Sequence, residues 1–179
     1  TSEAVFWLGQ DASGRGKVYA ANSISPQRIS THAIEASIST YEDISTARGY
    51  TYQYEGHSFY VLNFDEATWV YDLTTKMWHE RAFLDDGDLT RHRIDSLAYI
   101  PNLGIHIGGD YETNQVFELD PAARTDAGTA IKRLRATPHV SQNLKRVFHS
   151  LLQVDCETGV GLDGTQQGTD PQLMMRFSN

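Results

Sequence analysis

The chain has 179 residues, and its 15 Lys and Arg residues stand against 23 Asp and Glu residues, which gives a formal net charge of -8 at pH 7. This length is sufficient for one domain with its own core, or for one domain and part of another. The excess of negative charge repels phosphate groups and excludes a protein whose main task is to grip duplex DNA. We therefore expect no specific nucleic-acid binding.

Cysteine usage and hydropathy point to an intracellular place of assembly. Cys156 is the one cysteine, so the chain forms no internal disulfide. No apolar run is long enough to span a bilayer, and no signal-peptide pattern opens the sequence. These features favour assembly in a reducing cytoplasm without membrane contact. The chain begins at Thr1 rather than Met and runs directly into an apolar segment, which indicates a piece of a longer protein.

Short aromatic-rich runs separated by Gly, Asp and Asn predict strands and tight turns, so the expected fold class is all-β. One short helix is predicted near residues 31–41, with Ser30 or Thr31 as its N-cap. Its apolar stripe, spaced at i, i+4 and i+7, consists of Ile34, Ile38 and Tyr41.

Residues 48–82 predict an antiparallel meander of about four strands. Residues 50–54 alternate tyrosine with polar residues, as in a half-buried strand. Residues 59–62 are apolar on both faces, which is typical of a central strand. The third strand begins near residue 67, and the segment 72–76 turns the chain into the fourth.

Parts of this meander recur along the chain. Val18, Val70 and Val116 are each followed by an aromatic residue, each lies in a predicted strand that follows another short strand, and they are about 50 residues apart. This spacing is typical of β-propeller blades, so we predict a partial β-propeller of about three blades over residues 1–125, the first blade incomplete. An irregular antiparallel sandwich is the alternative. Three blades do not close a propeller, so either blades are missing or the sheets fan open.

The amino-acid composition and the length of the predicted strands change after residue 120. Residues 121–130 form a small, polar linker, and a longer alternating strand is predicted over residues 148–156, with Cys156 as a small buried apolar residue. A last strand begins at Leu173. We predict part of a second, β-sandwich-like domain over residues 126–179, truncated by the chain end.

Two short motifs resemble ligand loops. Residues 14–17 (GRGK) suggest a phosphate loop, but Asp11 stands where the pattern needs glycine and Val18 where it needs Ser or Thr, so a hairpin turn is favoured. The acidic segment Asp85 to Asp88 lacks the spacing and the distal glutamate of a calcium loop, which favours a solvated loop. No histidine has zinc-ligand spacing, and His79 and His92 are interpreted as ordinary surface or strand residues.

Aromatic rows stack sugars or unpaired bases in some proteins, so the tyrosine row at residues 50–54 raises that possibility. It has almost no positive charge near it, and core packing is the favoured interpretation. The carboxylates that a hydrolase would use fall in predicted turns, where acidic residues are common without catalysis: Asp65, Glu66, Asp85, Asp86 and Asp110. The sequence therefore predicts no enzyme, and no catalytic, cofactor-binding or metal-binding residues.

Six segments carry a resemblance to a known family: residues 5–10 (VFWLGQ), 26–35 (PQRISTHAIE), 50–61 (YTYQYEGHSFYV), 68–72 (TWVYD), 78–81 (WHER) and 155–161 (DCETGVG). In this order they resemble the packaged-DNA stabilization proteins, also called tail accessory factors or head-completion proteins, of short-tailed bacteriophages. The resemblance spans nearly the whole chain. The shared motifs read as blade scaffolding, with Trp7, Trp69 and Trp78 as core anchors and Gly56 and Gly108–Gly109 as turns.

The resemblance implies a structural virion protein that is assembled in the bacterial host cytoplasm. Such a protein docks below the portal after DNA packaging, seals the channel, and forms rings with the portal or adaptor and with tail needle or spike proteins. It implies no cofactor. Two alternatives remain: a glycan-binding or host-contact propeller of a phage tail, which requires aromatic and acidic side chains to converge on one exposed concave site, and an interaction propeller of cellular origin.

Overall fold

The computed structural model describes residues 4–22, 24–137, 145, 148, 150–155 and 173–176. The chain divides into two compact units, Thr1–Ile131 and Lys132–Asn179. The helix and strands described below all lie in the first unit. In the second unit, residues 150–155 and 173–176 belong to neither helix nor strand, and Cys156 lies outside the described residues. A β-sandwich-like domain over residues 126–179 stays a prediction.

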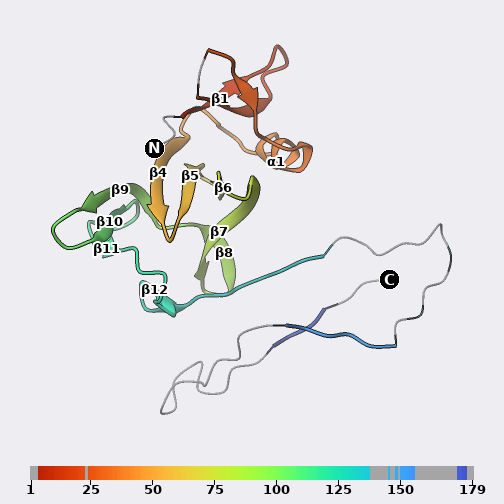
Figure 1. The fold of residues 1–179 in the computed structure, drawn as a ribbon, viewed down its shortest axis with the longest axis vertical. Helices are drawn as coiled ribbons and strands as arrows, with labels where there is room; N and C mark the ends of the chain where they lie inside the picture. Colours follow the sequence, from red (N-terminus) through yellow and green to blue (C-terminus); the bar gives the residue numbers. More distant parts are fainter. Residues whose placement is uncertain are drawn as a thin grey trace. The chain divides into compact units, whose positions relative to one another are not determined.

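The first sheet has three antiparallel strands in the order β1-β2-β3. In Figure 1 it is the red part of the ribbon, next to α1. They are β1 (Val5–Gln10), β2 (Gly16–Ala21) and β3 (Gln27–Arg28). The register of β1 and β2 pairs Trp7 with Tyr19 and Leu8 with Val18. Because side chains alternate across a strand, these two pairs lie on opposite faces of the sheet.

The expected helix is confirmed as α1 (His32–Ile38), and it is shorter than predicted. Thr31 is the N-cap, and its side-chain oxygen accepts a hydrogen bond from the Ile34 amide at 3.4 Å. Tyr41 lies beyond the helix end but still packs against the same core as Ile34 and Ile38. Among the described residues, no helix is long and apolar enough to cross a membrane.

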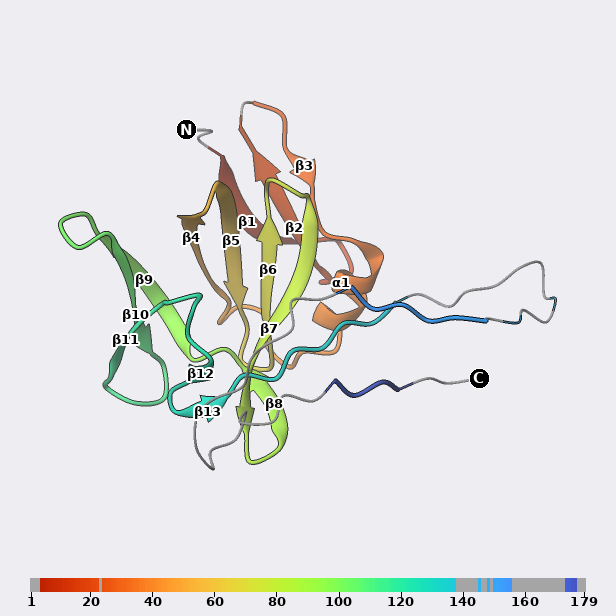
Figure 2. The same cartoon turned by 60° about the horizontal axis from the view of Figure 1, so that its bottom comes forward.

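The second sheet has five strands in the order β4-β5-β6-β7-β8. In Figure 2, β4 to β7 run side by side and β8 lies beside the lower end of β7. They are β4 (Arg48–Tyr54), β5 (His57–Asn63), β6 (Thr68–Asp72), β7 (Met77–Asp85) and β8 (Asp88–Arg91). The predicted four-strand meander is therefore confirmed as β4 to β7. The longer β7 pairs with β6 through its first half and with β8 through its second half.

The third sheet has the order β11-β10-β9, and a small hairpin follows it. The bounds are β9 (Ile94–Ile100), β10 (Ile105–Asp110), β11 (Val116–Glu118), β12 (Thr125–Asp126) and β13 (Thr129–Ala130). The three sequence repeats fall on the strand pairs β1-β2, β5-β6 and β10-β11, and each pair is antiparallel and adjacent. Three successive antiparallel sheets, each with one of the repeated strand pairs, confirm the partial propeller.

The second sheet is covered on both faces, which explains why residues 59–62 of β5 and 69–71 of β6 are apolar on both faces. On one face, Tyr60, Leu62 and Tyr71 form a core with Val18 of β2 and with the apolar stripe of α1. On the other face, Val61 and Val70 pack with Leu97 of β9. Successive sheets thus stack face to face in sequence order.

Two interpretations of single residues are wrong. Trp7 is no core anchor, because it lies on the face of the first sheet opposite to the buried Val18 and stacks on Tyr19. Trp69 and Trp78 do pack against the first core, and both are partly buried. Gly108 and Gly109 form no turn but lie inside β10. A Cβ atom on Gly108 would collide with the Ile94 side chain, so the absence of a side chain there permits close packing.

Candidate functional site

Three described turns use the same backbone device. Glu55–Gly56, Asp86–Gly87 and Ala127–Gly128 each carry two consecutive positive φ angles between paired strands. Two-residue hairpins of this kind match the twist of the strands they connect, and glycine tolerates the left-handed geometry. The acidic segment at residues 85–88 is therefore a tight hairpin, with Asp85 and Asp88 paired across it. Over the described residues, no group of three or more His, Cys, Asp or Glu side chains is arranged to hold a metal ion.

The glycine-rich loop before β2 is a hairpin, as expected. Asp11 accepts hydrogen bonds from the Ser13 amide at 2.8 Å and from the Arg15 amide at 3.0 Å, and its carboxylate lies 3.1 Å from Lys17 Nζ. The Arg15 amide, Lys17 and the Ser13 amide together lower the pKa of Asp11 to about 2. The lysine of the motif is thus paired with the loop's own carboxylate.

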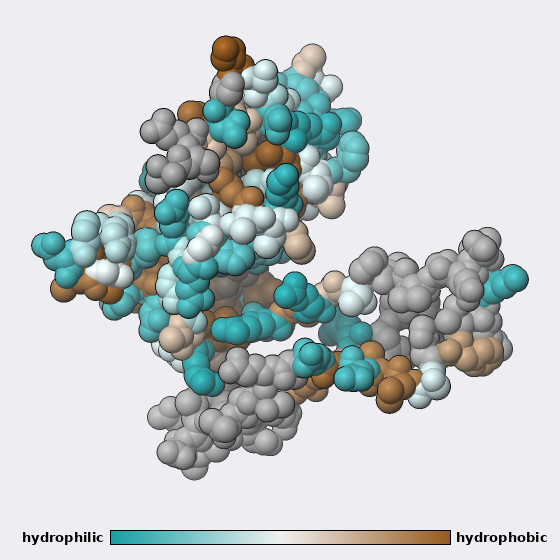
Figure 3. Space-filling model, viewed as in Figure 1, coloured by the Kyte–Doolittle hydropathy of each residue, from teal (hydrophilic) through white to brown (hydrophobic). Residues whose placement is uncertain are grey.

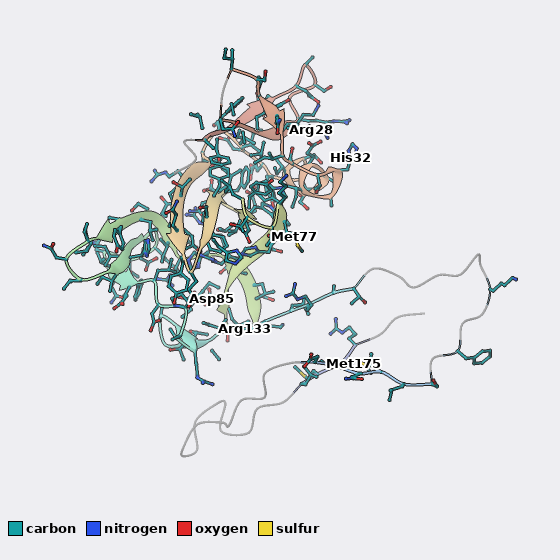
Figure 4. The ribbon with its side chains drawn as sticks, viewed as in Figure 1. Arg28, His32, Met77, Asp85, Arg133 and Met175 are labelled. Atoms are coloured by element: carbon teal, nitrogen blue, oxygen red, sulfur yellow. The ribbon has the colours of Figure 1, made fainter. Side chains whose placement is uncertain are left out.

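A groove of about 770 Å³ lies between this hairpin and α1, with residues of the segment after the helix on its rim. Arg28 and His32 mark this end of the unit in Figure 4, well away from Asp85. Glu35 lines the groove, but it accepts hydrogen bonds from Arg28 Nε at 2.6 Å and from Ser30 Oγ at 2.6 Å. Burial favours a raised pKa for Glu35, yet these bonds outweigh it and lower the pKa.

The groove offers a sugar little to stack on. Besides the His32 imidazole, its described lining has the Tyr41 ring, whose hydroxyl already accepts a hydrogen bond from Trp69 Nε1 at 2.8 Å. The tyrosine row of β4 lies elsewhere, because Tyr52 is buried and Tyr50 and Tyr54 pack against the second core, which confirms core packing for that row. The described residues therefore give no support to the glycan-binding alternative.

The strongest polar arrangement joins the second and third sheets, at Arg91, His92 and Arg93. Arg91, the last residue of β8, is buried and stacks over the Tyr111 ring, with its guanidinium carbon 3.8 Å from the ring centre. Its Nη2 atom lies 2.5 Å from Asp95 Oδ1. The interpretation of His92 as an ordinary surface or strand residue is wrong, because His92 is buried between the ends of β8 and β9.

Arg93 donates two hydrogen bonds to the Asp110 carboxylate, from Nε at 3.0 Å and from Nη2 at 2.5 Å. Thr113 Oγ1 and the Glu112 amide also donate to the Asp110 carboxylate. Arg93 is the largest cause of the strongly lowered pKa of Asp110, whose side chain is fully buried. Asp110 ends β10 rather than sitting in an open turn, and its bidentate pairing is structural.

His92 is the least expected member of this group. It is 5% exposed, and neither ring nitrogen makes a hydrogen bond to a described residue. Its Nδ1 atom lies 3.7 Å from Asp126 Oδ2 in β12. Burial lowers the pKa of His92, Arg81 and Arg91 add to that effect, and Asp126 opposes it. Burial thus favours the neutral form of the imidazole in the folded protein.

This geometry predicts that stability falls in mild acid. The folded pKa of His92 lies below the unfolded value of about 6.5, so the unfolded chain binds the proton first and stability decreases as the pH drops below that value. We expect the melting temperature to fall more steeply between pH 7 and pH 5 in the wild type than in His92→Gln. His32→Gln, at an exposed position of α1, is the control and should follow the wild-type curve. Parallel curves for the wild type and His92→Gln would contradict the prediction.

Comparison with known proteins adds a family. Residues 1–124 match the family model described as Bacteriophage P22 Gp10, beta-propeller. The chain belongs to this family. The match covers nearly all of the first unit and contains all three stacked sheets. No curated protein matches the sequence.

Membership in the Gp10 family makes the chain a structural protein of the phage virion, as the sequence resemblance implied. It also identifies the stacked sheets as propeller blades, since the family is described by its β-propeller. The charged junction at Arg91, His92 and Arg93 is then a connection between two blades. The sequence analysis missed this junction because its ion pairs join different strands. Arg93 pairs with Asp110 at the end of β10, and Arg91 at the end of β8 pairs with Asp95 in the next strand.

Proposed function

We propose that this protein docks below the portal ring once DNA has been packaged, seals the channel and stabilises the packaged DNA. The match of residues 1–124 to the Gp10 family carries this proposal. The partners are the portal or adaptor on one side and tail needle or spike proteins on the other, and the protein works as a ring of copies. Assembly takes place in the bacterial host cytoplasm.

The connections between the sheets support a role under mechanical load. Trp78 Nε1 of the second sheet donates to the Ile29 carbonyl beside the first sheet at 2.9 Å. Asn63 Nδ2 at the end of β5 donates to the Ile94 carbonyl of the third sheet at 3.0 Å, and Asn63 is 1% exposed. Buried, directional bonds resist sliding of one sheet over another, since separation leaves polar groups unpaired away from water. A plug that holds back compressed DNA requires such stiffness.

The charge balance supports the same role. A conduit that retains DNA and later lets it pass must not bind phosphate tightly, and a net charge of -8 provides repulsion at short range. Several described arginines are also neutralised internally, as the pairs Arg93–Asp110 and Arg91–Asp95 show. Positive charge is thereby withdrawn from the surface.

Deletion of the gene from its phage tests the proposal. We expect filled heads to form normally, because packaging precedes the seal, and then to lose their DNA, because densely packed DNA repels itself outward through the open portal. The measurement is nuclease-resistant DNA per capsid, followed over time after lysis. Purified full-length protein added to freshly packaged heads should restore retention, and denatured protein should not. Stable, infectious particles from the deletion strain would contradict the proposal.

A further inference from the structure

A group of buried polar atoms at the junction of the second and third sheets has no hydrogen-bond partner. The atoms are Tyr50 Oη, Arg81 Nη1, Arg91 Nε and both ring nitrogens of His92. Among the described residues, no other buried side-chain nitrogen or oxygen atom is unpartnered. Buried polar groups in proteins nearly always have a partner, so several such atoms in one place indicate a ligand site.

The side chains come from separate strands but belong to one cluster. Arg81 Nη2 donates a hydrogen bond to Tyr52 Oη at 2.7 Å, and Tyr52 and Tyr50 lie on the same face of β4. Arg81 is also the register partner of Thr68. The Thr68 hydroxyl oxygen accepts a hydrogen bond from the His92 amide at 3.2 Å. These contacts connect Tyr50, Arg81 and His92.

Arg91, the last residue of β8, directly precedes His92 and completes the cluster. Burial raises the pKa of Tyr50, and the charges of Arg81 and Arg91 oppose that rise. Burial lowers the pKa of His92, and the same two arginines lower it further. Both arginines therefore lie close enough to both side chains to influence their protonation. The Tyr50 hydroxyl keeps its proton and can donate it.

The chemistry of these atoms favours an anion. Tyr50 Oη, Arg81 Nη1 and Arg91 Nε are donors, and the neutral imidazole, which burial favours, adds one donor and one acceptor. A water molecule would also have to donate its own hydrogens, whereas an anion only accepts. Each of the atoms is enclosed by protein, so the ligand is a small ion rather than part of a larger molecule.

The charges around the cluster leave Arg81 without a carboxylate. Asp95 is shared by Arg91, at 2.5 Å, and Arg48, at 2.7 Å. Arg81 forms no ion pair with a described carboxylate, and its Nη2 atom bonds a neutral hydroxyl instead. Asp126 Oδ2, 3.7 Å from the imidazole and too far for a hydrogen bond, opposes an anion from that side. One negative charge beside Arg81 would compensate this cation.

We propose that the junction binds one chloride ion, held by Arg81 Nη1, Arg91 Nε, the Tyr50 hydroxyl and a ring nitrogen of His92. The ion joins the second sheet, through Tyr50 and Arg81, to the segment that leads into the third sheet. Polar and hydrophobic residues are mixed on the surface over β9–β11 (Figure 3), whereas this site is internal. Chloride binding does not require the portal-docking role proposed above.

Chloride itself is the probe, used with the full 179-residue chain. The melting temperature is measured in mixtures of sodium chloride and sodium gluconate, so that chloride varies while the ionic strength stays constant. The width of the chloride NMR signal reports binding directly, because the signal broadens when the ion exchanges with a protein site. Tyr50→Phe and Arg81→Gln each remove a donor. Tyr60→Phe is the matched control, a buried tyrosine in the first core on the opposite face of the second sheet.

We expect the wild type and Tyr60→Phe to melt at higher temperature as chloride replaces gluconate, because a ligand of the folded state stabilises it, and the effect should saturate. Both should broaden the chloride signal. Arg81→Gln should bind chloride about tenfold or more weakly, since it lacks the charged donor. Tyr50→Phe should bind it several-fold more weakly, since it lacks only the hydroxyl.

If Arg81→Gln does not fold, Tyr50→Phe decides the question. Two outcomes would overturn the proposal. A wild type that shows neither chloride dependence nor signal broadening would indicate ordered water at the junction. A chloride effect of equal size in the wild type and Tyr50→Phe would place the ion elsewhere on the protein.

Discussion

Replacement of Phe64 by alanine is expected to lower the free energy of unfolding by about 3 to 5 kcal/mol. Phe64 follows β5, is fully buried in the first core, and packs its ring against Tyr41 with centres 4.9 Å apart. Truncation removes this apolar surface and leaves a cavity between the second sheet and the segment after α1. Chemical denaturation followed by tryptophan fluorescence provides the measurement.

Tyr99→Ala is the control for Phe64→Ala. Tyr99 is an aromatic residue in a strand of the same unit, and it is 55% exposed. Its truncation should cost about 1 kcal/mol or less, because surface substitutions rarely cost more. Equal losses for the two variants would show that the buried position of Phe64 does not govern the stability of this unit.

Arg93→Met is expected to cost a similar amount, about 3 to 5 kcal/mol, because it leaves the fully buried Asp110 carboxylate without its cation. The stem of methionine preserves most of the packing, so the loss reports the charge. The double variant Arg93→Met with Asp110→Leu should regain much of the stability, since the buried carboxylate and its cation are then both gone. Thermal unfolding of the single and double variants measures the coupling between the two side chains.

Arg48→Met provides the comparison for Arg93→Met. Arg48 also pairs with a carboxylate, Asp95, at 2.7 Å, but its side chain is 72% exposed. An exposed pair contributes about 1 kcal/mol or less because water and salt screen it. If Arg48→Met proved as costly as Arg93→Met, burial would not be the source of the effect.

The sequence by itself determined the fold class and most of the order of the helix and strands. The alternation at residues 50–54 and the two-sided apolar run at residues 59–62 each correctly predicted the burial of their strand, because a period of two reports directly which faces are covered. The repeat of about 50 residues predicted the three sheets, because each repeat corresponds to one group of adjacent strands. The helix cap and the hairpin turns could also be predicted from the sequence, since they depend on residues within a few positions of one another.

The tertiary structure decided what each sheet packs against. Trp7 and Val18 look equally apolar in sequence, yet they lie on opposite faces of the first sheet, and only the face with Val18 packs against the second sheet. Arg91 and His92 are buried and Arg93 is partly buried, and their partners Tyr111, Asp126 and Asp110 are brought to them by the third sheet and the following hairpin. Local sequence periodicity carries no information about such distant partners, so charged residues that look solvated in the sequence became the buried connection between two blades.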